Sequence, residues 1–114
     1  MRLQPSEAEI QRAITDYLSA ERIWWMRMNS GAFVLWTEGK RRFFRSGTTG
    51  MADILCTPPS FKSGRPFILW IEVKSHIGRQ SQNQIDFQAE VEEHGHVYLL
   101  ARGLEEVELW LMSH

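Results

Sequence analysis

The sequence predicts a mixed α/β fold with a central sheet, and three observations support this prediction. A helical apolar pattern opens the chain, an apolar strand-like run lies near its middle, and a helix pattern followed by a second apolar strand comes later. Helices and strands that alternate in this way are typical of a sheet covered by helices. With 114 residues, of which 43% are hydrophobic, the chain is expected to form a single domain over residues 1–114.

The first helix is predicted over residues 7–21. Ser6 and Glu9 have the spacing of a capping box, and the apolar residues that follow recur at helical spacing. Three segments rich in β-forming residues come next and are predicted as strands at 23–28, 32–36 and 41–45. Turn chemistry at 29–31 predicts that the first two strands pair as a hairpin, with the third as a return strand.

The second half of the chain surrounds its most apolar strand. Residues 67–74 are nearly all apolar before Lys74, so this strand is expected in the centre of the sheet. A Gly-rich loop and a short strand at 52–57 precede it, and Ser81 is expected to cap a helix over 82–94. A strand at 96–101 and a helix after Gly103 complete the predicted elements.

Composition and charge exclude several classes of protein. Apolar runs reach only five residues, far below the roughly 18 that span a membrane. The N-terminus lacks the apolar core of a secretory signal, and one cysteine cannot form an internal disulfide, so we expect a cytoplasmic protein. Residues 1–65 carry ten basic and six acidic side chains and residues 66–114 carry three and eight, a polarity that permits a basic face for a polyanion.

Two charged residues stand at the end of the predicted central strand. Glu72 and Lys74 are two residues apart, so they project from one face while Ile71 and Val73 point to the other. Burial of charge requires mutual pairing or a ligand. Seen alone, the motif is explained by a simple ion pair where a strand reaches solvent.

Asp53 adds a second carboxylate to this pair. It lies in a strand-like segment after the Gly-rich loop, 19 residues before Glu72, a spacing that suits two adjacent strands. If these strands pair, two carboxylates meet and repel unless a proton or a divalent cation lies between them. Oxygen ligands favour Mg²⁺ or Mn²⁺, and Lys74 beside such an ion could orient or deprotonate water. This combination is typical of phosphodiester hydrolysis.

The same residues resemble the PD-(D/E)xK nuclease superfamily, through Gly50-Met51-Ala52-Asp53 and Glu72-Val73-Lys74. Within it, the virus-type replication-repair nuclease (VRR-NUC) domain is the most similar, and the resemblance covers nearly the whole chain. It includes Glu7-x-x-Ile10-Gln11, Arg27-x-Asn29-Ser30-Gly31-Ala32, Ser81-x-x-Gln84 and Gly95. Ala52 stands where the superfamily name implies proline, at a position that shapes the turn. The resemblance implies a restriction-endonuclease-like αβββαβ core, with a mixed central sheet flanked by helices.

The resemblance also implies roles for individual residues. It assigns catalysis to Asp53, Glu72, Lys74, Gln84 and Glu7, and it assigns Mg²⁺ or Mn²⁺ to Asp53, Glu72, Val73 and Glu7. Glu9 is the alternative to Glu7, and helix capping explains either acid. A solvated helix face is the alternative for Gln84, with Gln80, Gln82 and Gln88 as competing glutamines.

A DNA substrate and a dimeric state follow from the same resemblance. It implies a phage or bacterial DNA-repair endonuclease that cuts branched DNA, including four-way (Holliday) junctions, as a homodimer in the cytoplasm of a bacterial or phage-infected cell. Cations interleaved with aromatic residues predict DNA contacts from Arg27, Lys40, Arg41, Arg42, Arg45 and His76. The Trp-rich early hairpin is the candidate dimer surface. The alternative is a non-catalytic DNA-binding module on the same fold.

Overall fold

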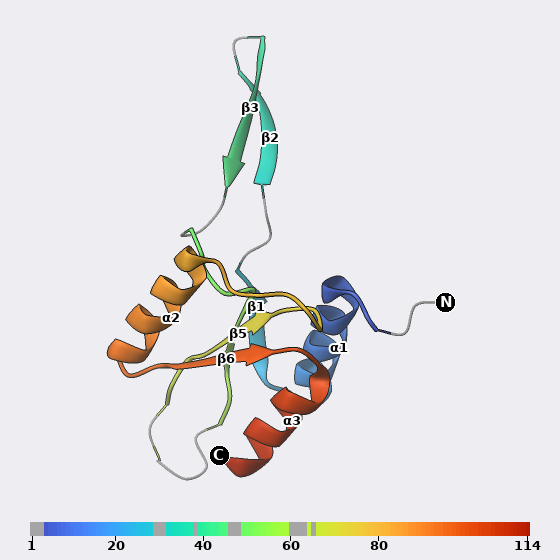
Figure 1. The fold of residues 1–114 in the computed structure, drawn as a ribbon, viewed down its shortest axis with the longest axis vertical. Coiled ribbons are helices and arrows are strands. Elements are labelled where there is room, and N and C mark those ends of the chain that lie inside the picture. Colours follow the sequence, from blue (N-terminus) through green and yellow to red (C-terminus); the bar gives the residue numbers. More distant parts are fainter. Residues whose placement is uncertain (1–3, 29–31, 38, 46–48, 60–63, 65) are drawn as a thin grey trace.

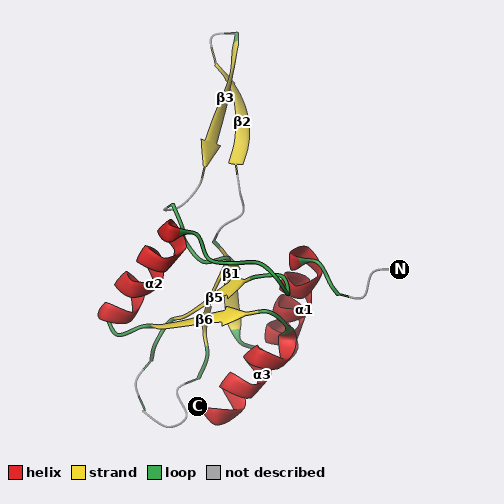
Figure 2. Ribbon diagram, viewed as in Figure 1, coloured by secondary structure: helices red, strands yellow, loops and turns green. Residues whose placement is uncertain are grey.

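A mixed four-stranded sheet with helices on both faces forms the body of the molecule, and a separate two-stranded hairpin projects from it (Figures 1 and 2). The computed structural model describes residues 4–28, 32–37, 39–45, 49–59, 64 and 66–114. Within the hairpin, the backbone alone is described at 32–37 and 41–45. The α/β class predicted from the sequence is confirmed.

Of the three helices among the described residues, two begin at the serines that the sequence predicts as caps. Helix α1 (Glu7–Ala20) begins after Ser6 and α2 (Gln82–Glu93) after Ser81, and each N-cap serine forms a capping box with the residue three positions on. Helix α3 (Leu104–Ser113) follows Gly103, which provides no side-chain cap. Within the described residues, no helix is long and apolar enough to cross a membrane.

The sheet has the strand order β1-β4-β5-β6. Strand β4 (Ile54–Thr57) lies antiparallel to both of its neighbours, β1 (Trp24–Arg27) and β5 (Leu69–Val73). Strand β6 (Val97–Ala101) runs parallel to β5. Strand β5 therefore lies between two partners, as its apolar sequence predicts. Its parallel partner β6 is reached through α2, which is the connection that a parallel pair requires.

The predicted pairing of the first two early strands is wrong. Strand β2 (Ala32–Thr37) pairs with β3 (Lys40–Arg45) around Gly39, whereas β1 pairs with β4 in the main sheet. The Met28 N–H continues the β1–β4 contact by donating to the Asp53 carbonyl at 2.8 Å, and the Trp25 indole donates to Ser19 of α1. Strand β1 is thus held in the main sheet by contacts with both α1 and the segment before β4, and the turn at 29–31 lies outside the described residues.

The two faces of the sheet are covered unequally. Helices α1 and α3 share one face, where residues such as Ile14, Leu18 and Ile71 form the larger apolar core. On the opposite face α2 packs over a smaller cluster, in which Phe87 meets the Trp70 ring edge to face at a centroid distance of 5.0 Å.

Candidate functional site

The pairing of β4 with β5 brings Asp53 and Glu72 together, as the sequence predicts. Ile54 lies opposite Ile71, so Asp53, one residue before β4, lies beside the C-terminal end of β5. The Asp53 Oδ2 atom accepts a hydrogen bond of 2.7 Å from the Val73 N–H. This bond ties the Asp53 side chain to the backbone that carries Glu72.

Glu72 is a carboxyl group buried in the sheet. Glu72 is 2% exposed. Its Oε2 atom accepts a 3.1 Å hydrogen bond from Gln84 Nε2, and Lys74 Nζ lies 3.8 Å from the same oxygen. Burial raises the pKa of Glu72 to about 8, and the charge of Asp53 adds to this rise while the Lys74 ammonium opposes it. Among the described residues, Glu72 Oε1 is buried without a hydrogen-bond partner.

Gln84 reaches Glu72 because its side chain also closes the capping box of α2. Its Oε1 accepts the Ser81 N–H at 2.8 Å, and its backbone N–H donates to Ser81 Oγ at 3.2 Å. With Oε1 held at Ser81, the Nε2 donor is turned toward Glu72. The structure therefore places the Gln84 side chain against Glu72.

Lys74 projects from the same side as Glu72, as strand alternation predicts. Its backbone N–H donates to the Ala101 carbonyl at 3.0 Å, which extends the β5–β6 contact past the end of β5. The side chain is 13% exposed, so its ammonium lies at the boundary between the buried carboxyl group and solvent. Such a position suits a group that handles a proton or a water molecule.

The two acids at the start of α1 have different positions. The Glu9 carboxylate accepts hydrogen bonds from the backbone and hydroxyl of Ser6, so helix capping accounts for this side chain. Glu7 is exposed in the first turn, and its charge contributes the smallest of the effects that raise the pKa of Glu72. The choice of Glu7 as the acid near the site stays a prediction.

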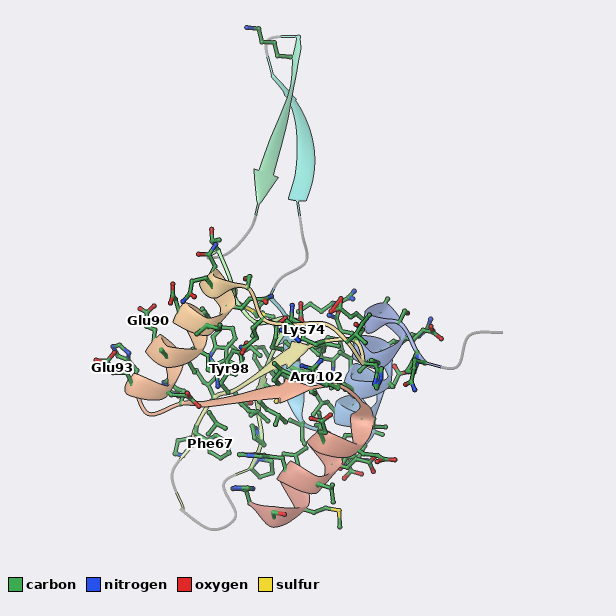
Figure 3. The ribbon with its side chains drawn as sticks, in the orientation of Figure 1. Phe67, Lys74, Glu90, Glu93, Tyr98 and Arg102 are labelled. Atoms are coloured by element: carbon green, nitrogen blue, oxygen red, sulfur yellow. The ribbon has the colours of Figure 1, made fainter. Side chains whose placement is uncertain are left out.

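Tyr98 is a residue of this region that the sequence did not single out, and its partner Gln80 is one of the glutamines that compete with Gln84. Gln80 Nε2 donates to Tyr98 Oη at 3.1 Å and to Gln88 Oε1 at 3.0 Å, and Tyr98 lies between α2 and the sheet (Figure 3). Burial raises the pKa of Tyr98, and the charges of Glu72 and Asp53 add to the rise. A tyrosine in an otherwise aliphatic strand is the only signal in the sequence that points to it.

The predicted DNA contacts are spread over three parts of the structure. Arg27 ends β1 next to the site and donates to Gln11 Oε1 of α1 through Nε and Nη2. Lys40 is exposed at the outer end of the hairpin, and His76 is exposed in the loop after Lys74. Arg41, Arg42 and Arg45 lie on β3, and their side chains fall outside the description.

The chemistry of the site fits a divalent cation held by oxygen ligands. Two neighbouring carboxylates, one with an unpaired buried oxygen, leave a place for positive charge that a proton or a hard cation can fill. Val73 is buried through its apolar side chain, so any contribution it makes must come from its main chain. Within the described part of the chain, no three His, Cys, Asp or Glu side chains gather to form a larger metal-binding group.

Comparison with known proteins adds no assignment to this geometry. No model of a known protein family, no curated protein and no solved structure matches the chain.

Proposed function

We propose that the chain is a divalent-metal-dependent DNA endonuclease that hydrolyses phosphodiester bonds in branched DNA, including four-way junctions. The observation that supports this proposal most strongly is that Gln84 and Lys74 both contact the buried Glu72 carboxyl group, while Asp53 accepts from the adjacent Val73 N–H. An isolated structural ion pair needs neither the second carboxylate nor the buried unpaired oxygen.

The order of elements in the main sheet supports a restriction-endonuclease-like core. When the β2–β3 hairpin is set aside, the elements from α1 to β6 follow the order α-β-β-β-α-β. Asp53 and Glu72, which carry the resemblance to VRR-NUC domains, lie at the ends of the two inner strands of this sheet. Their position is compatible with the proposed family.

In the proposed reaction each residue has a separate task. Asp53 and Glu72, with the Val73 main chain and with Glu7 as a more distant acid, would hold Mg²⁺ or Mn²⁺. When bound, the cation supplies Lewis acidity toward a phosphate oxygen and lowers the pKa of bound water. Lys74 orients the attacking water as an ammonium donor, or accepts its proton as the neutral amine after losing its own proton to solvent, and Gln84 keeps the Glu72 carboxylate in one orientation.

In the proposed complex the protein binds DNA through its phosphate backbone. Arg27, His76 and Lys40 would contact phosphates, together with Arg41, Arg42 and Arg45 of β3. Phosphate contacts carry no information about base sequence, so binding should weaken steeply with salt and should show no fixed recognition sequence.

We also propose that the active species is a homodimer. The β2–β3 hairpin contacts no other helix or strand among the described elements, and its first strand is apolar in sequence from Ala32 to Trp36. Trp24 and Met26 on the edge strand β1 are exposed and add apolar surface. Two sites related by two-fold symmetry would cut a symmetric junction in pairs. A single monomeric species in gel filtration at micromolar concentration would contradict this part of the proposal.

The proposed activity is tested by incubating the chain with an end-labelled four-way junction, a flap and linear duplex DNA, with Mg²⁺, Mn²⁺ or a chelator. Asp53→Asn keeps an oxygen acceptor for the Val73 N–H and removes the charge, so it should abolish metal-dependent cleavage without unfolding the chain. Glu93→Gln, on an exposed carboxylate near the end of α2, is the matched control and should cleave normally (Figure 3). Absence of cleavage, with DNA binding that the chelator does not change, would favour the binding module instead.

A further inference from the structure

We propose that the loop from Ser75 to Gln80 is a wedge that enters unstacked DNA beside the active site, with Ile77 as the inserted side chain. This inference rests on the proposed nuclease function and specifies the substrate class that the same site selects.

The loop begins directly after Lys74 and packs against it. A Cβ atom added at Gly78 would lie 3.4 Å from Lys74 Cδ and 3.2 Å from Ser75 Oγ, so the loop backbone rests on the lysine stem. An alanine there would meet Lys74 Cδ at ordinary contact distance, and the Ser75 hydroxyl would have to shift by a few tenths of an ångström. The loop tip is therefore adjacent to the proposed catalytic lysine.

Arg102 holds the loop in one conformation. Its Nη1 atom donates to the carbonyl oxygens of Ser75 at 2.8 Å and Gly78 at 2.6 Å, and the Gly78 N–H donates to the Ser75 carbonyl at 3.2 Å. Arg102 comes directly after β6, whose Ala101 carbonyl accepts the Lys74 N–H (Figure 3). The loop is thus organised in the free protein and does not need substrate to shape it.

Ile77 is presented to solvent by this clamped loop. It is 82% exposed, the largest value among the large hydrophobic side chains that the structure describes. A single exposed hydrophobic residue needs no explanation in general, but this one is held in place beside a proposed active site. Its neighbours His76 and Arg79 are exposed, and no acidic residue occurs between Lys74 and Asp86 in the sequence.

An apolar tip beside an arginine and a histidine fits the chemistry of a distorted DNA step. Proteins that insert isoleucine, leucine or similar side chains between bases must unstack them, while cations contact the flanking phosphates. Unstacking is least costly where stacking is already interrupted, as at a junction, a flap or a nick. The loop would therefore favour branched DNA over continuous duplex without reading any base sequence.

The test measures base unstacking separately from cleavage. Junction DNA with 2-aminopurine at the branch point is mixed with the chain in a Glu72→Gln background and in chelator, so that no cleavage occurs. Insertion of the Ile77 side chain should unstack the 2-aminopurine and raise its fluorescence. Ile77→Ser should abolish this rise. The same variant should weaken junction binding at least about 10-fold, the lower end of what burial of one isoleucine contributes. Met112→Ser, on a residue 78% exposed near the end of α3, is the matched control and should behave as the parent.

Arg102 supplies a second, independent variant. Arg102→Ala should speed amide exchange at Gly78 and reduce the fluorescence rise. Arg102→Lys keeps a donor, so it should retain part of the protection of the Gly78 amide and part of the fluorescence rise. Thermal unfolding of each variant confirms that the chain remains folded, because neither Ile77 nor Arg102 belongs to the core.

The outcomes separate this inference from the function on which it rests. Equal fluorescence and equal junction affinity for Ile77→Ser and its parent would overturn the wedge. If the unmodified chain cleaves DNA in a metal-dependent way but the Glu72→Gln chain that keeps Ile77 gives no fluorescence rise, only the wedge is overturned. Absence of both DNA binding and cleavage would overturn the proposed function and the wedge together.

Discussion

Gly50→Ala tests how closely the loop before Asp53 must approach α2. Gly50 has φ +82°, and a Cβ there would overlap the Asn83 carbonyl oxygen and lie 2.5 Å from its carbon and 2.9 Å from Gln84 N. Ordinary contact begins at 3.4 Å, so the start of α2 would have to retreat by roughly 1 Å. The hydrogen bond from Gln84 to Glu72, now 3.1 Å, would then be lost.

Gly95 provides a matched control for the backbone conformation. It also has φ +82°, but an added Cβ would meet nothing within 4 Å. Gly95→Ala should therefore lower the free energy of unfolding by about 1–2 kcal/mol, the cost of a left-handed alanine. Gly50→Ala should lose that amount and about 1–3 kcal/mol more, the usual cost of forcing atoms into a packed region.

The free energies of unfolding are compared by urea denaturation, and cleavage rates are measured in parallel. With a slope of about 1–3 kcal/mol per molar urea, a difference of 2 kcal/mol moves the midpoint by roughly 1 M. Cleavage by Gly50→Ala should fall by about 100-fold, as expected when a catalytic group is displaced by about 1 Å. Equal stability losses in the two variants would refute the close approach of Gly50 to α2.

Three further predictions concern the carboxyl group at the centre of the site. The pKa of Glu72 is raised from an ordinary value of 4.5 to about 8, so between these pH values the metal-free folded chain retains a proton that the unfolded chain releases. The free energy of unfolding should therefore fall as the pH rises from about 4.5 to 8. Urea titrations across this range should show a flatter profile for Glu72→Gln, and parallel profiles would contradict the raised pKa. Lys74→Gln should keep the fold and cation binding but cleave at least about 100-fold more slowly, measured as a single-turnover rate, and a change of less than twofold would exclude Lys74 from proton transfer. Ser81→Ala and Gln84→Ala should each lower the free energy of unfolding by about 1 kcal/mol, measured by thermal or urea unfolding, because each removes part of the capping box. Only Gln84→Ala should slow cleavage, because Glu72 loses its donor in that variant alone. Equal cleavage rates for the two variants would separate Gln84 from the site.

Local patterns account for the parts of the fold that the sequence predicted correctly. The N-terminus of α1 follows from Ser6 and Glu9, three residues apart, because a capping box is made by neighbours in the chain. The central position of β5 follows from its apolar run, since a strand with both faces covered needs no alternation. The meeting of Asp53 with Glu72 follows from one further assumption, that their strands pair.

Competition between distant segments explains the prediction that failed. Turn residues at 29–31 favoured pairing of the strands on either side, but β1 found a different partner in β4. The Trp25 contact with Ser19 and the bond from Met28 to Asp53 join segments that a turn signal does not describe. A local preference gives way when packing elsewhere is more favourable.

The chemical groups of the site and the local elements that carry them can be read from the residue types and their spacing. The burial of Glu72, its hydrogen bond from Gln84, and the lack of a partner for one of its oxygens among the described residues depend on how the chain packs. The roles of Tyr98 and of Arg102 likewise required contacts between residues far apart in the chain. The physical reason is that spacing in a sequence specifies which side chains share a face, whereas burial, electrostatic shifts and close approaches depend on what packs against that face.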